Sequence, residues 1–596
     1  MRTPFSGARR SSRMRNLRGL LVLLAPYRAR ALLTLGALLL GTAATVAPPL
    51  VAKLAIDRGI ERADMTVLLA CVLAFLAVAL LAWAMTYLQT YLVGWIGQRV
   101  LADLRIEIFA HLQSMPLRFY ESRPAGVLIS RITNDVEALD TLVTDSVVTL
   151  FGAGLTLIGT IVVLLVLDLR LALLTFLALA PMAAGSVWFR LASTGAFRRT
   201  RETIGALTAY LQETLSGVIV VRAFAAERRH EARFAQLNAA NRDANMATVY
   251  LNAAYFPAVE LLSGLAIAGI VLYGGDQAIA GAISLGTIVA FVAALSNLFE
   301  PVQQLSQLYT TYQSGMAALE KIFTLLDERP HPADRDGSAS LRPVRGEVRF
   351  EGVSFAYGAR AGEQEGAQPD YALREIDLVV PAGQTVALVG ATGAGKSTLV
   401  KLLCRFYNPT AGRILLDGVD LRTVRARSLR SQLGIVPQEA FLFSGTIAQN
   451  IAFGRPQASE REIRAAASAL GALELIEALP QGMETEIGER GVQLSAGQRQ
   501  LIAFARALIA DPRILILDEA TSSVDLHTEA RLQRALRRLL AGRTAFVIAH
   551  RLSTIRDAAQ IVVLEHGRIV ERGSHEQLLD AGGPYARMHA DWSVAA

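Results

Sequence analysis

Long uncharged apolar stretches alternate with polar segments through the first half of the chain. Each stretch meets the roughly 20 residues that a helix needs to cross a hydrocarbon core of about 30 Å. The pattern predicts six membrane-spanning helices, with a turn around Asp276 between the last two. They cover Ala31 to Ala52, Met65 to Gly97, Ser146 to Leu167, Leu171 to Phe189, Ala244 to Gly275 (interrupted only by Glu260), and Gln277 to Phe299.

The polar segments between these stretches differ in length. The connections Lys53 to Asp64 and Asp168 to Arg170 are short, whereas Gln98 to Asp145 and Arg190 to Asp243 each hold about fifty residues with helix-like patterning. At about 1.5 Å per residue, such helices project far beyond a bilayer. An even number of spans returns the chain to its starting side. The first 30 residues carry eight arginines and no acid, which predicts that this side is the cytoplasm and the membrane the cytoplasmic membrane.

The second half of the chain contains a glycine-rich string between an apolar strand, Thr385 to Val389, and a helix-like run from Ser397. This context predicts a phosphate-binding loop for ATP. Glycines let backbone amides surround phosphate oxygens, the lysine reaches the outer phosphates, and the serine hydroxyl binds Mg²⁺. The residues of the string are Gly390, Ala391, Thr392, Gly393, Ala394, Gly395, Lys396, Ser397 and Thr398.

A second motif follows about a hundred residues later. Ile514 to Leu517 is typical of a fully buried parallel strand and ends in two carboxylates. We expect Asp518 to bind Mg²⁺ and Glu519 to act on the attacking water. Upstream, Ser495 precedes an alanine-rich helical stretch through Ala510, so it is predicted to cap a helix whose start offers another place for a phosphate.

The string Leu494-Ser495-Ala496-Gly497-Gln498 closely resembles the LSGGQ signature of the ATP-binding cassette (ABC) family, with Ala496 as its one departure. Further matches occur in the family's order around Gln438, Thr485 to Gly491, Asp525 and His550. The resemblance implies that Gln438 senses Mg²⁺ and water and couples the site to the membrane domain, and that His550 contacts the terminal phosphate. It also implies nucleotide contacts from four further residues, Tyr357 by stacking on adenine, and Gly497, Gln498 and Asp525.

The long inner segments resemble those of exporter-type ABC transporters, which end in short coupling helices. The local strings place these helices near Tyr120 to Ala125 and near Gly217 to Phe224. The resemblance implies a half-transporter working as a dimer, with each ATP between Lys396 of one chain and Ser495 of the other. A homodimer is favoured, but Ala496 leaves open a consensus half of a heterodimer with a second half-transporter. The expected substrate is hydrophobic or amphipathic, and lipids, drugs and peptides all suit an apolar cavity.

Composition narrows the alternatives. Hydrophobic residues make up 52% of the chain and mean hydropathy is +0.37, which indicates membrane insertion. The net charge of +7 is concentrated at the N-terminus and does not predict nucleic-acid binding. A soluble cassette ATPase would lack the spans, an importer would have shorter inner loops, and a peptide exporter with a fused protease would carry Cys and His near its N-terminus. The two cysteines, Cys71 and Cys404, are predicted to be inert.

The expected fold is therefore an all-α transmembrane domain of six helices fused to an α/β P-loop NTPase domain. The predicted boundaries are 1–30 for a basic N-terminus, 31–310 for the membrane domain, 311–345 for a helix extension and linker, and 346–596 for the nucleotide-binding domain. Glu260 is interpreted either as a contact for a cationic substrate or proton, or as a polar group between helices. Glu300 is expected to be partly solvated, and Gly358 to Asp370 to form a solvated hairpin tip.

Overall fold

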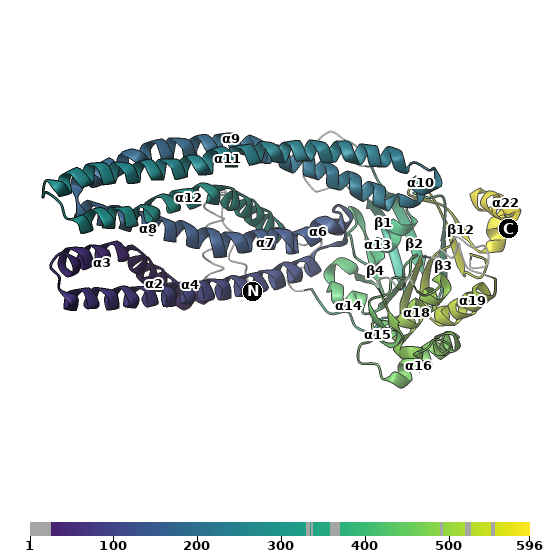
Figure 1. Cartoon of the computed structure of the whole chain (residues 1–596). Helices are drawn as coiled ribbons and strands as arrows, with labels where there is room; N and C mark the ends of the chain where they lie inside the picture. Colours follow the sequence, from purple (N-terminus) through teal and green to yellow (C-terminus); the bar gives the residue numbers. More distant parts are fainter. Residues whose placement is uncertain are drawn as a thin grey trace. The chain divides into compact units, whose positions relative to one another are not determined.

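The computed structural model describes residues 25–328, 334, 338–357, 370–488, 491, 493–518, 526–549 and 555–595. The chain divides into two compact units. The first comprises residues 1–114 and 124–329, and the second comprises 115–123 and 330–596. In the described residues the first unit is helical, whereas the second combines sheets with shorter helices (Figure 1). The predicted extension Gly358 to Asp370 lies outside the described residues except for its last member.

Four helices of the first unit, α4, α9, α11 and α12, far exceed the average helix length in globular proteins. Short π-helical turns cover Ala55–Ile60 (η2) and Leu142–Ser146 (η3), and a 3-10 turn, Ala25–Tyr27 (η1), precedes the first helix. The α-helices are α2 (Arg28–Val46), α3 (Pro48–Leu54), α4 (Met65–Ser114), α6 (Ala125–Ile132), α7 (Asn134–Thr141), α8 (Val147–Leu167), α9 (Leu169–Ser216), α10 (Val218–Ala223), α11 (Glu227–Ile279) and α12 (Leu285–Leu326).

Six helical segments among the described residues are long and apolar enough to cross a membrane, which confirms the predicted number of spans. The predicted turn around Asp276 is wrong. Helix α11 continues through Asp276 to Ile279, and α12 begins only at Leu285. The real turn contains Gly281 with a φ of 74° and ends at Ser284, which caps α12. Because this turn is itself short and largely apolar, hydropathy alone does not locate it.

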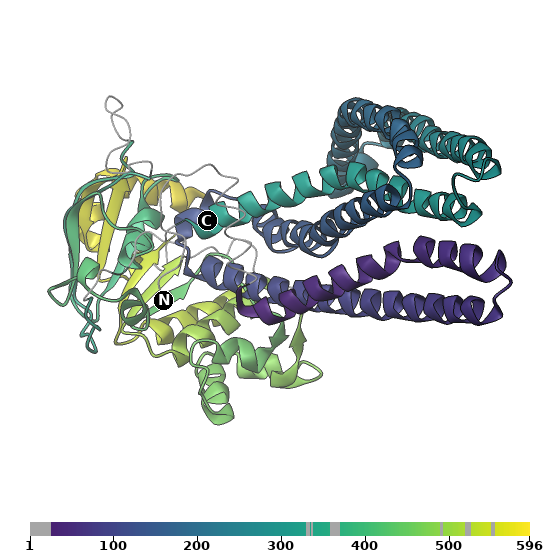
Figure 2. The same ribbon diagram turned by 90° about the vertical axis from the view of Figure 1, so that its left-hand side faces the viewer.

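Adjacent helices of this unit pack closely along their lengths. Helices α9 and α11 lie side by side in both views (Figures 1 and 2). Between them the hydroxyls of Ser186 and Tyr255 lie 2.7 Å apart, and the Phe189 ring stacks on Tyr255 with centroids at 4.4 Å. Elsewhere a Cβ added to Gly315 would lie 2.5 Å from Cβ of Leu142, so glycine permits this approach of α12 to η3.

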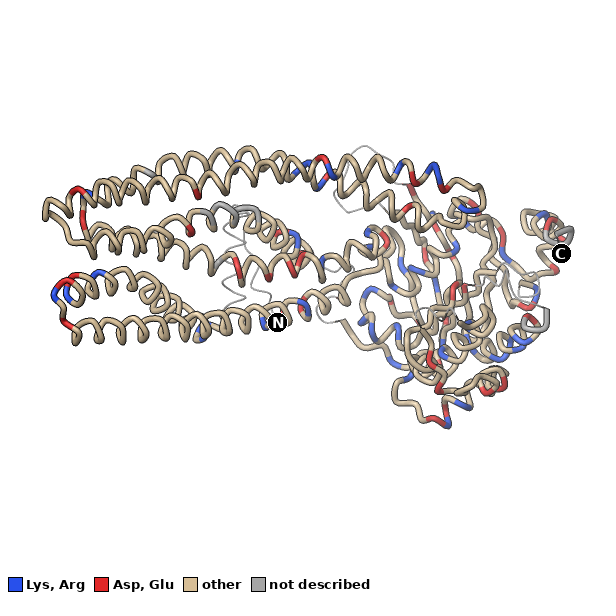
Figure 3. Tube along the Cα trace, in the orientation of Figure 1, with Lys and Arg blue, Asp and Glu red and all other residues tan. Residues whose placement is uncertain are grey.

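Charged residues are concentrated towards the ends of the long helices, and few lie between (Figure 3). Many large apolar side chains of the spans are exposed, including Leu80, Leu177 and Leu272. Soluble proteins rarely expose apolar surface on this scale, whereas a lipid environment favours it. The first unit is therefore suited to a membrane.

The second unit contains three sheets. A six-stranded sheet has the order β12-β11-β3-β10-β9-β6, a four-stranded sheet the order β2-β1-β4-β5, and β7 pairs with β8. In the larger sheet β11, β3, β10, β9 and β6 are parallel neighbours. The strands are β1 (Val348–Phe355), β2 (Leu373–Val380), β3 (Thr385–Val389), β4 (Ala411–Leu416), β5 (Val419–Asp420), β6 (Leu433–Val436), β7 (Gly445–Thr446), β8 (Glu486–Ile487), β9 (Ile514–Asp518), β10 (Thr544–Ile548), β11 (Gln560–Glu565) and β12 (Arg568–Gly573).

The larger sheet separates two apolar cores. Val386 and Leu388 of β3 point into one core, and Ala387 and Val389 point into the other, as the alternation of strand side chains requires. Both faces are thus buried, which explains the unbroken apolar runs that predict β3 and β9 from the sequence. The helices of the unit are α5 (Leu117–Glu121), α13 (Lys396–Leu403), α14 (Ala426–Arg430), α15 (Ile447–Ala452), α16 (Glu460–Ala469), α17 (Leu473–Glu477), α18 (Ala496–Ile509), α19 (Leu526–Leu540), α21 (His575–Asp580) and α22 (Pro584–Ala595).

The two predicted coupling helices fare differently. For the second, predicted at Gly217 to Phe224, the structure has the short helix α10, and its coupling role stays a prediction. The first, predicted near Tyr120 to Ala125, is placed too late, because the short helix α5 covers Leu117–Glu121. Pro116 starts α5, and Pro124 starts the next helix, so the two prolines fix the boundaries. Residues 115–123 belong to the second unit, although the segments on either side belong to the first.

Candidate functional site

The phosphate loop joins β3 to α13, as predicted. Gly390, Gly393 and Gly395 have φ values of 149°, 86° and 107°, which side chains rarely tolerate. A Cβ on Gly390 would lie 2.2 Å from the carbonyl oxygen of Leu564, and one on Gly395 would lie 2.8 Å from that of Ala372. The loop conformation therefore depends on glycine for both backbone torsion and space.

The loop encloses the side chain of Lys396. This residue is 7% exposed, and its Nζ donates to the carbonyl oxygens of Gly390 at 2.7 Å and Ala391 at 2.9 Å. Burial lowers the pKa of Lys396, while the nearby carboxylate of Asp518 acts in the opposite direction. The loop thus holds an ammonium group close to the carboxylate that ends β9.

The start of α13 presents backbone amides that can bind phosphate oxygens. Gly395 occupies the N-cap without a side-chain cap. Among the described residues there is no hydrogen-bond acceptor for the backbone amides of Gly393, Gly395, Lys396 and Ser397. Several free amides at a helix N-terminus form an anion-binding site.

The register of the parallel strands brings the other predicted residues to the same edge of the sheet. Asp518 of β9 lies opposite Ile548 of β10, which lies opposite Leu388 of β3. On the other side of β9, Val436 of β6 pairs with Leu517. Gln438 follows two residues after Val436, so it leaves the sheet at the same edge as Asp518. The carboxyl ends of parallel strands are where open α/β sheets bind ligands.

The oxygens that gather here fit Mg²⁺ bound together with a nucleotide. The side chains of Ser397 and Gln438 are exposed, and Asp518 is half-buried. Within the described ranges no group of three or more His, Cys, Asp or Glu residues forms a metal cage. Mg²⁺ usually takes one or two protein ligands and fills the rest with waters and substrate phosphates, which suits this sparse set of hard oxygen donors.

Tyr357 lies beside the phosphate helix. Its hydroxyl is 3.0 Å from Oγ1 of Thr398, and its ring makes an edge contact with Tyr407 at a centroid distance of 5.3 Å. The Nζ of Lys401 lies 5.8 Å from the centroid of the Tyr357 ring. Tyr357 as a whole residue remains 38% exposed despite these contacts.

The signature segment begins α18 in the predicted way. The Oγ of Ser495 accepts from the amide of Gln498 at 3.2 Å, and the side chain of Gln498 accepts from the amide of Ser495 at 2.9 Å. This reciprocal pair is a capping box and confirms the predicted N-cap. Gly497 is buried, whereas Ala496 is exposed, so its methyl group points away from the core.

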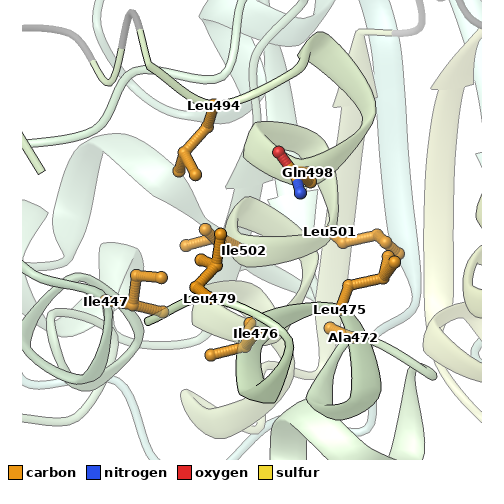
Figure 4. A pocket seen from close by; sticks show the side chains of 9 residues that line it. All are labelled: Ile447, Ala472, Leu475, Ile476, Leu479, Leu494, Gln498, Leu501 and Ile502. Atoms are coloured by element: carbon orange, nitrogen blue, oxygen red, sulfur yellow. The ribbon is translucent and has the colours of Figure 1, made fainter. Parts of the chain in front are cut away.

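Beneath this helix start lies a small cavity lined almost wholly by apolar side chains (Figure 4). Gln498 is its polar member, and the others come from α15, α17, α18 and the loops beside them. We interpret this cavity as a packing feature because its lining offers a ligand little to hydrogen-bond with. Gln498 thus also has a structural role, because its side chain caps α18 and lines this cavity.

Three predicted residues lie outside the described residues: Glu519, Asp525 and His550. Glu519 follows Asp518 directly, and His550 lies two positions after Ile548, the partner of Asp518. Their assignments as catalytic or nucleotide-binding residues stay predictions.

Sequence reasoning missed a cluster that ties α5 to the phosphate helix. One carboxylate oxygen of Glu121 accepts from Nζ of Lys401 at 2.6 Å, and the other accepts from the hydroxyl of Tyr407. Burial by itself raises the pKa of Glu121, but these two hydrogen bonds outweigh it and leave the pKa lowered. No local pattern signals the cluster, because 280 residues separate Glu121 from Lys401.

A second missed group supports the segment after Gln438. Arg506 of α18 donates to the carbonyl oxygens of Phe441 and Asn450, at 2.9 Å in each case. Asn450, which is 2% exposed, in turn bonds both backbone groups of Phe443. Burial lowers the pKa of Arg506. The helix that begins at the signature therefore also fixes the chain that follows Gln438.

The two acids of the spans differ from each other. Glu260 is exposed on α11 and makes no hydrogen bond to another described residue of the same chain, so both interpretations of it stay predictions. Glu300 is exposed as expected and accepts from Nε2 of Gln304 at 3.0 Å. Cys404 is buried, and burial raises its pKa to about 12, as expected of an inert thiol.

Comparison with known proteins adds two family matches. Residues 32–302 match the ABC transporter transmembrane region, and residues 373–522 match the ABC transporter family. The first match covers the described spans, and the second runs from β2 to beyond β9.

Individual relatives cover nearly the whole chain. An ATP-dependent lipid A-core flippase of Syntrophus aciditrophicus (strain SB) is 41% identical over 583 residues, which is 97% of this chain and 95% of the flippase. An uncharacterized ABC transporter ATP-binding protein, YknV of Bacillus subtilis (strain 168), is 39% identical over 96% of this chain and 93% of its own length. A solved structure of a bacterial Atm1-family ABC exporter with ATP bound aligns with a TM-score of 0.78 and 35% identity, covering 95% of this chain and 99% of that one.

Proposed function

Because this chain belongs to the ABC transporter family, as an exporter half-transporter, we propose that it moves an amphipathic, lipid-like molecule across the cytoplasmic membrane. The chain is a multi-pass membrane ATPase whose hydrolysis of ATP is coupled to transport. One observation carries the proposal: a glycine-dependent phosphate loop lies next to Asp518 in a chain that also holds six apolar spans.

In this proposal the phosphates bind the free amides at the start of α13 and the ammonium group of Lys396. Ser397, Gln438 and Asp518 hold Mg²⁺, which neutralises charge on the outer phosphates. Glu519 orients and polarises the attacking water, and His550 contacts the terminal phosphate. Little covalent chemistry is required, because phosphoryl transfer depends mainly on positioning and charge neutralisation.

Around this centre, the ring of Tyr357 stacks on adenine. Ser495, Gly497 and Gln498 of a partner chain complete the site from the start of its α18, and Asp525 contributes from the loop after Glu519. The capping box leaves the hydroxyl proton of Ser495 free to donate to a phosphate, since Oγ uses only its lone pairs in accepting from Gln498.

The substrate class rests on relatives. Several flippases that align with nearly the full chain are named for lipid A-core, as in Syntrophus aciditrophicus and Thiobacillus denitrificans. A lipid-like molecule also fits the apolar character of the spans. Peptides and amphipathic drugs are the alternative substrates. The three classes are distinguished by measuring whether the lipid, the peptide or the drug crosses the membrane only when ATP is present.

A homodimer is the favoured assembly. The chain supplies its own Lys396, Asp518 and Glu519, and the exposed methyl of Ala496 leaves the capping box of Ser495 intact. The alternative is a heterodimer in which this chain provides the catalytic glutamate and a slightly altered signature. Activity of the chain expressed alone favours the homodimer, whereas activity only after addition of a second half-transporter contradicts it.

Transport is tested in liposomes that contain the purified chain and a trace of fluorescent phospholipid. We expect ATP to change the share of fluorophore accessible to an impermeant quencher. Glu519→Gln should abolish this change while it retains ATP binding, with ATP turnover reduced at least ~100-fold, in keeping with loss of a general base. ATP hydrolysis without lipid movement, together with ATP-dependent uptake of a peptide or dye, would contradict the lipid proposal.

Orientation is tested by thiol labelling of intact cells. In a background without Cys71 and Cys404, a cysteine at Ala282, in the turn between α11 and α12, should react with an impermeant reagent added outside. A matched cysteine at the exposed Arg413 of β4 should react only after permeabilisation. The reverse pattern would overturn the cytoplasmic placement of the second unit.

A further inference from the structure

The charged residues that border the apolar stretches of α2 and α4 lie at the same depth along the two helices. The apolar stretch of α2 begins directly after Arg30, and that of α4 ends directly before Gln98 and Arg99. These ends lie together, because the guanidinium carbon of Arg30 is 3.4 Å from the centroid of the Trp95 ring on α4. Two independent helices therefore mark the same boundary between hydrocarbon and water.

Aromatic side chains gather at this boundary. The ring of Tyr27 meets the Trp95 ring edge-on with centroids at 5.7 Å, and the guanidinium carbon of Arg99 lies 5.4 Å from the Trp95 centroid. Tryptophan and tyrosine are enriched where a membrane meets water, because one part of each ring is apolar and another forms hydrogen bonds. This placement agrees with the level that the charges indicate.

A groove of about 570 Å³ opens along one face of α4 at this level. Tyr91, Trp95, Gln98 and Arg99 supply aromatic and polar groups to it, while Gly94 and Ala102 leave room beside them. These positions recur at the spacing of one helical turn, so they form a continuous surface.

The charge of the groove is not balanced within the described chain. Neither Arg30 nor Arg99 has a carboxylate partner among the residues that the structure describes. Asp103, one turn beyond Arg99, already accepts a hydrogen bond from the hydroxyl of Tyr27 at 2.6 Å. In sequence, residues 1–24 add six arginines and no acid, so they do not complement the groove either.

We propose that this groove binds the headgroup phosphate of an anionic glycerophospholipid of the inner leaflet. Arg99 in the groove and Arg30 beside it, both of which contact the Trp95 ring, bind the phosphate, and the acyl chains run along exposed apolar side chains of α4 such as Leu80. Basic pockets at the membrane surface select anionic headgroups in this way. The lipid is a resident ligand at the surface of α2 and α4, and the proposal does not depend on which molecule is transported.

Fluorescence quenching provides the test. The full chain, with Trp83, Trp188 and Trp592 changed to Phe, retains Trp95 as its one tryptophan. It is placed in phosphatidylcholine nanodiscs that contain a small, equal fraction of either phosphatidylglycerol or phosphatidylcholine brominated near the top of an acyl chain. We expect brominated phosphatidylglycerol to quench Trp95 at roughly thirtyfold lower mole fraction, the scale expected for two arginines at an anionic surface.

Charge variants identify the site. The pair Arg30→Gln and Arg99→Gln should remove the preference for phosphatidylglycerol, whereas lysine at both positions should retain most of it. The matched control changes Arg58, near the far end of the first span, and Arg62, in the turn that follows it, to Gln and should leave the preference unchanged. Free inorganic phosphate in the buffer should not compete, because it lacks the acyl chains.

Two results would overturn the proposal: equal quenching by both brominated lipids, or a preference that survives the Arg30→Gln and Arg99→Gln pair. Competition by free phosphate would show instead a simple anion site. If the single-tryptophan chain does not fold, the phosphatidylglycerol that co-purifies with the native chain is counted and compared with that of Arg99→Gln alone. Equal counts would also overturn the proposal.

Discussion

Two helices of the second unit begin at predicted phosphate contacts, yet their N-termini are built differently. Helix α13 starts at Gly395 in a left-handed conformation, with no side-chain cap and with amides that lack acceptors among the described residues. Helix α18 starts at Ser495, whose side chain and that of Gln498 satisfy each other's amides. Both helices carry the positive end of a dipole, and both have first-turn amides without an acceptor among the described residues. The capping box of α18, however, uses the amides of Ser495 and Gln498 and leaves only those of Ala496 and Gly497 open.

The difference indicates a division of labour. The α13 terminus needs an anion to satisfy its amides, so it should bind phosphate within one chain. The α18 terminus is partly satisfied by its capping box, so it can add only the hydroxyl proton of Ser495, the amides of Ala496 and Gly497, and its dipole. This arrangement suits a surface that joins an existing nucleotide complex from a partner chain, as the family resemblance implies. Damage to α13 should therefore abolish binding, and damage to α18 should mainly reduce turnover.

The largest effect is expected for Lys396→Ala. The variant removes the charge that the loop holds against Gly390 and Ala391, and we expect ATP turnover to fall at least ~100-fold, the scale for losing a preorganised charge at a phosphoryl group. ATP binding, measured by filter binding or calorimetry, should also be lost. Arg413→Ala, on an exposed strand residue, is the control and should behave like the native chain. If Lys396→Ala bound ATP with native affinity, the idea that the α13 terminus provides ATP binding within one chain would be wrong.

A second, smaller effect is expected for Ser495→Ala. Turnover should fall about 100-fold, the low end of the range for loss of one such donor, while ATP binding persists, because the variant removes one donor from the partner's phosphate. Loss of the cap should also cost about 1 kcal/mol of stability. Ser574→Ala is a closely matched control, since Ser574 and Gln577 form the same capping box at α21.

The control separates capping from catalysis. Ser574→Ala should lose a similar amount of thermal stability yet retain ATP turnover. Equal turnover losses in the two variants would mean that Ser495 acts through helix stability alone. Loss of ATP binding by Ser495→Ala, without unfolding, would contradict the division of labour between α13 and α18.

Local features of this comparison could be predicted from the sequence. The strand Thr385–Val389, the glycine loop, the cap at Ser495 and the end of α18 near Ala510 all depend on neighbouring residues. Positive φ values and capping boxes are encoded within a few positions, so motif and context suffice. The apolar spans could also be predicted from the sequence, because the bilayer thickness fixes their length.

Features that depend on distant parts of the chain could not be predicted. The partners of Glu121 lie 280 and 286 residues away, and no periodicity connects them. The turn after α11 was misplaced because a single charged residue, Asp276, is a weaker signal than the capping of Ser284 and the torsion of Gly281. Similarly, hydropathy gave no reason to pair Arg30 with Trp95.

A third, still smaller effect is expected for Ala496→Gly, which restores the family's usual signature. The methyl of Ala496 is exposed, and the capping box is formed without any contribution from its side chain. We expect ATP turnover of the chain expressed alone to change less than about threefold, because the donors at the helix start remain. A tenfold or greater gain would show that the methyl obstructs the partner's phosphate and would favour the heterodimer.

The smallest effect concerns the other end of α13, where Lys401 binds Glu121 of α5. Both side chains are about a third exposed, at 32% and 37%, so their ion pair should contribute at most about 1 kcal/mol. Glu121→Gln should therefore lower the apparent melting temperature at neutral pH by only about 2–4 °C. Glu351→Gln, which removes the more exposed pair with Arg413, is the control and should change it less.

The dependence of this difference on pH follows from the direction of the pKa shifts. The pKa of Glu121 lies below its ordinary value of 4.5, so the carboxylate stabilises the folded chain above that value and loses this contribution as pH falls through the lowered pKa. The pKa of Lys401 is raised above 10.5; burial opposes this shift, but Glu121 outweighs it, so the ammonium persists at neutral pH. The melting difference between native chain and Glu121→Gln should stay constant from about pH 7 to about pH 5 and shrink below the ordinary value. If this difference in melting temperature persisted unchanged in stronger acid, packing and not the charge of Glu121 would hold α5 against the phosphate helix α13.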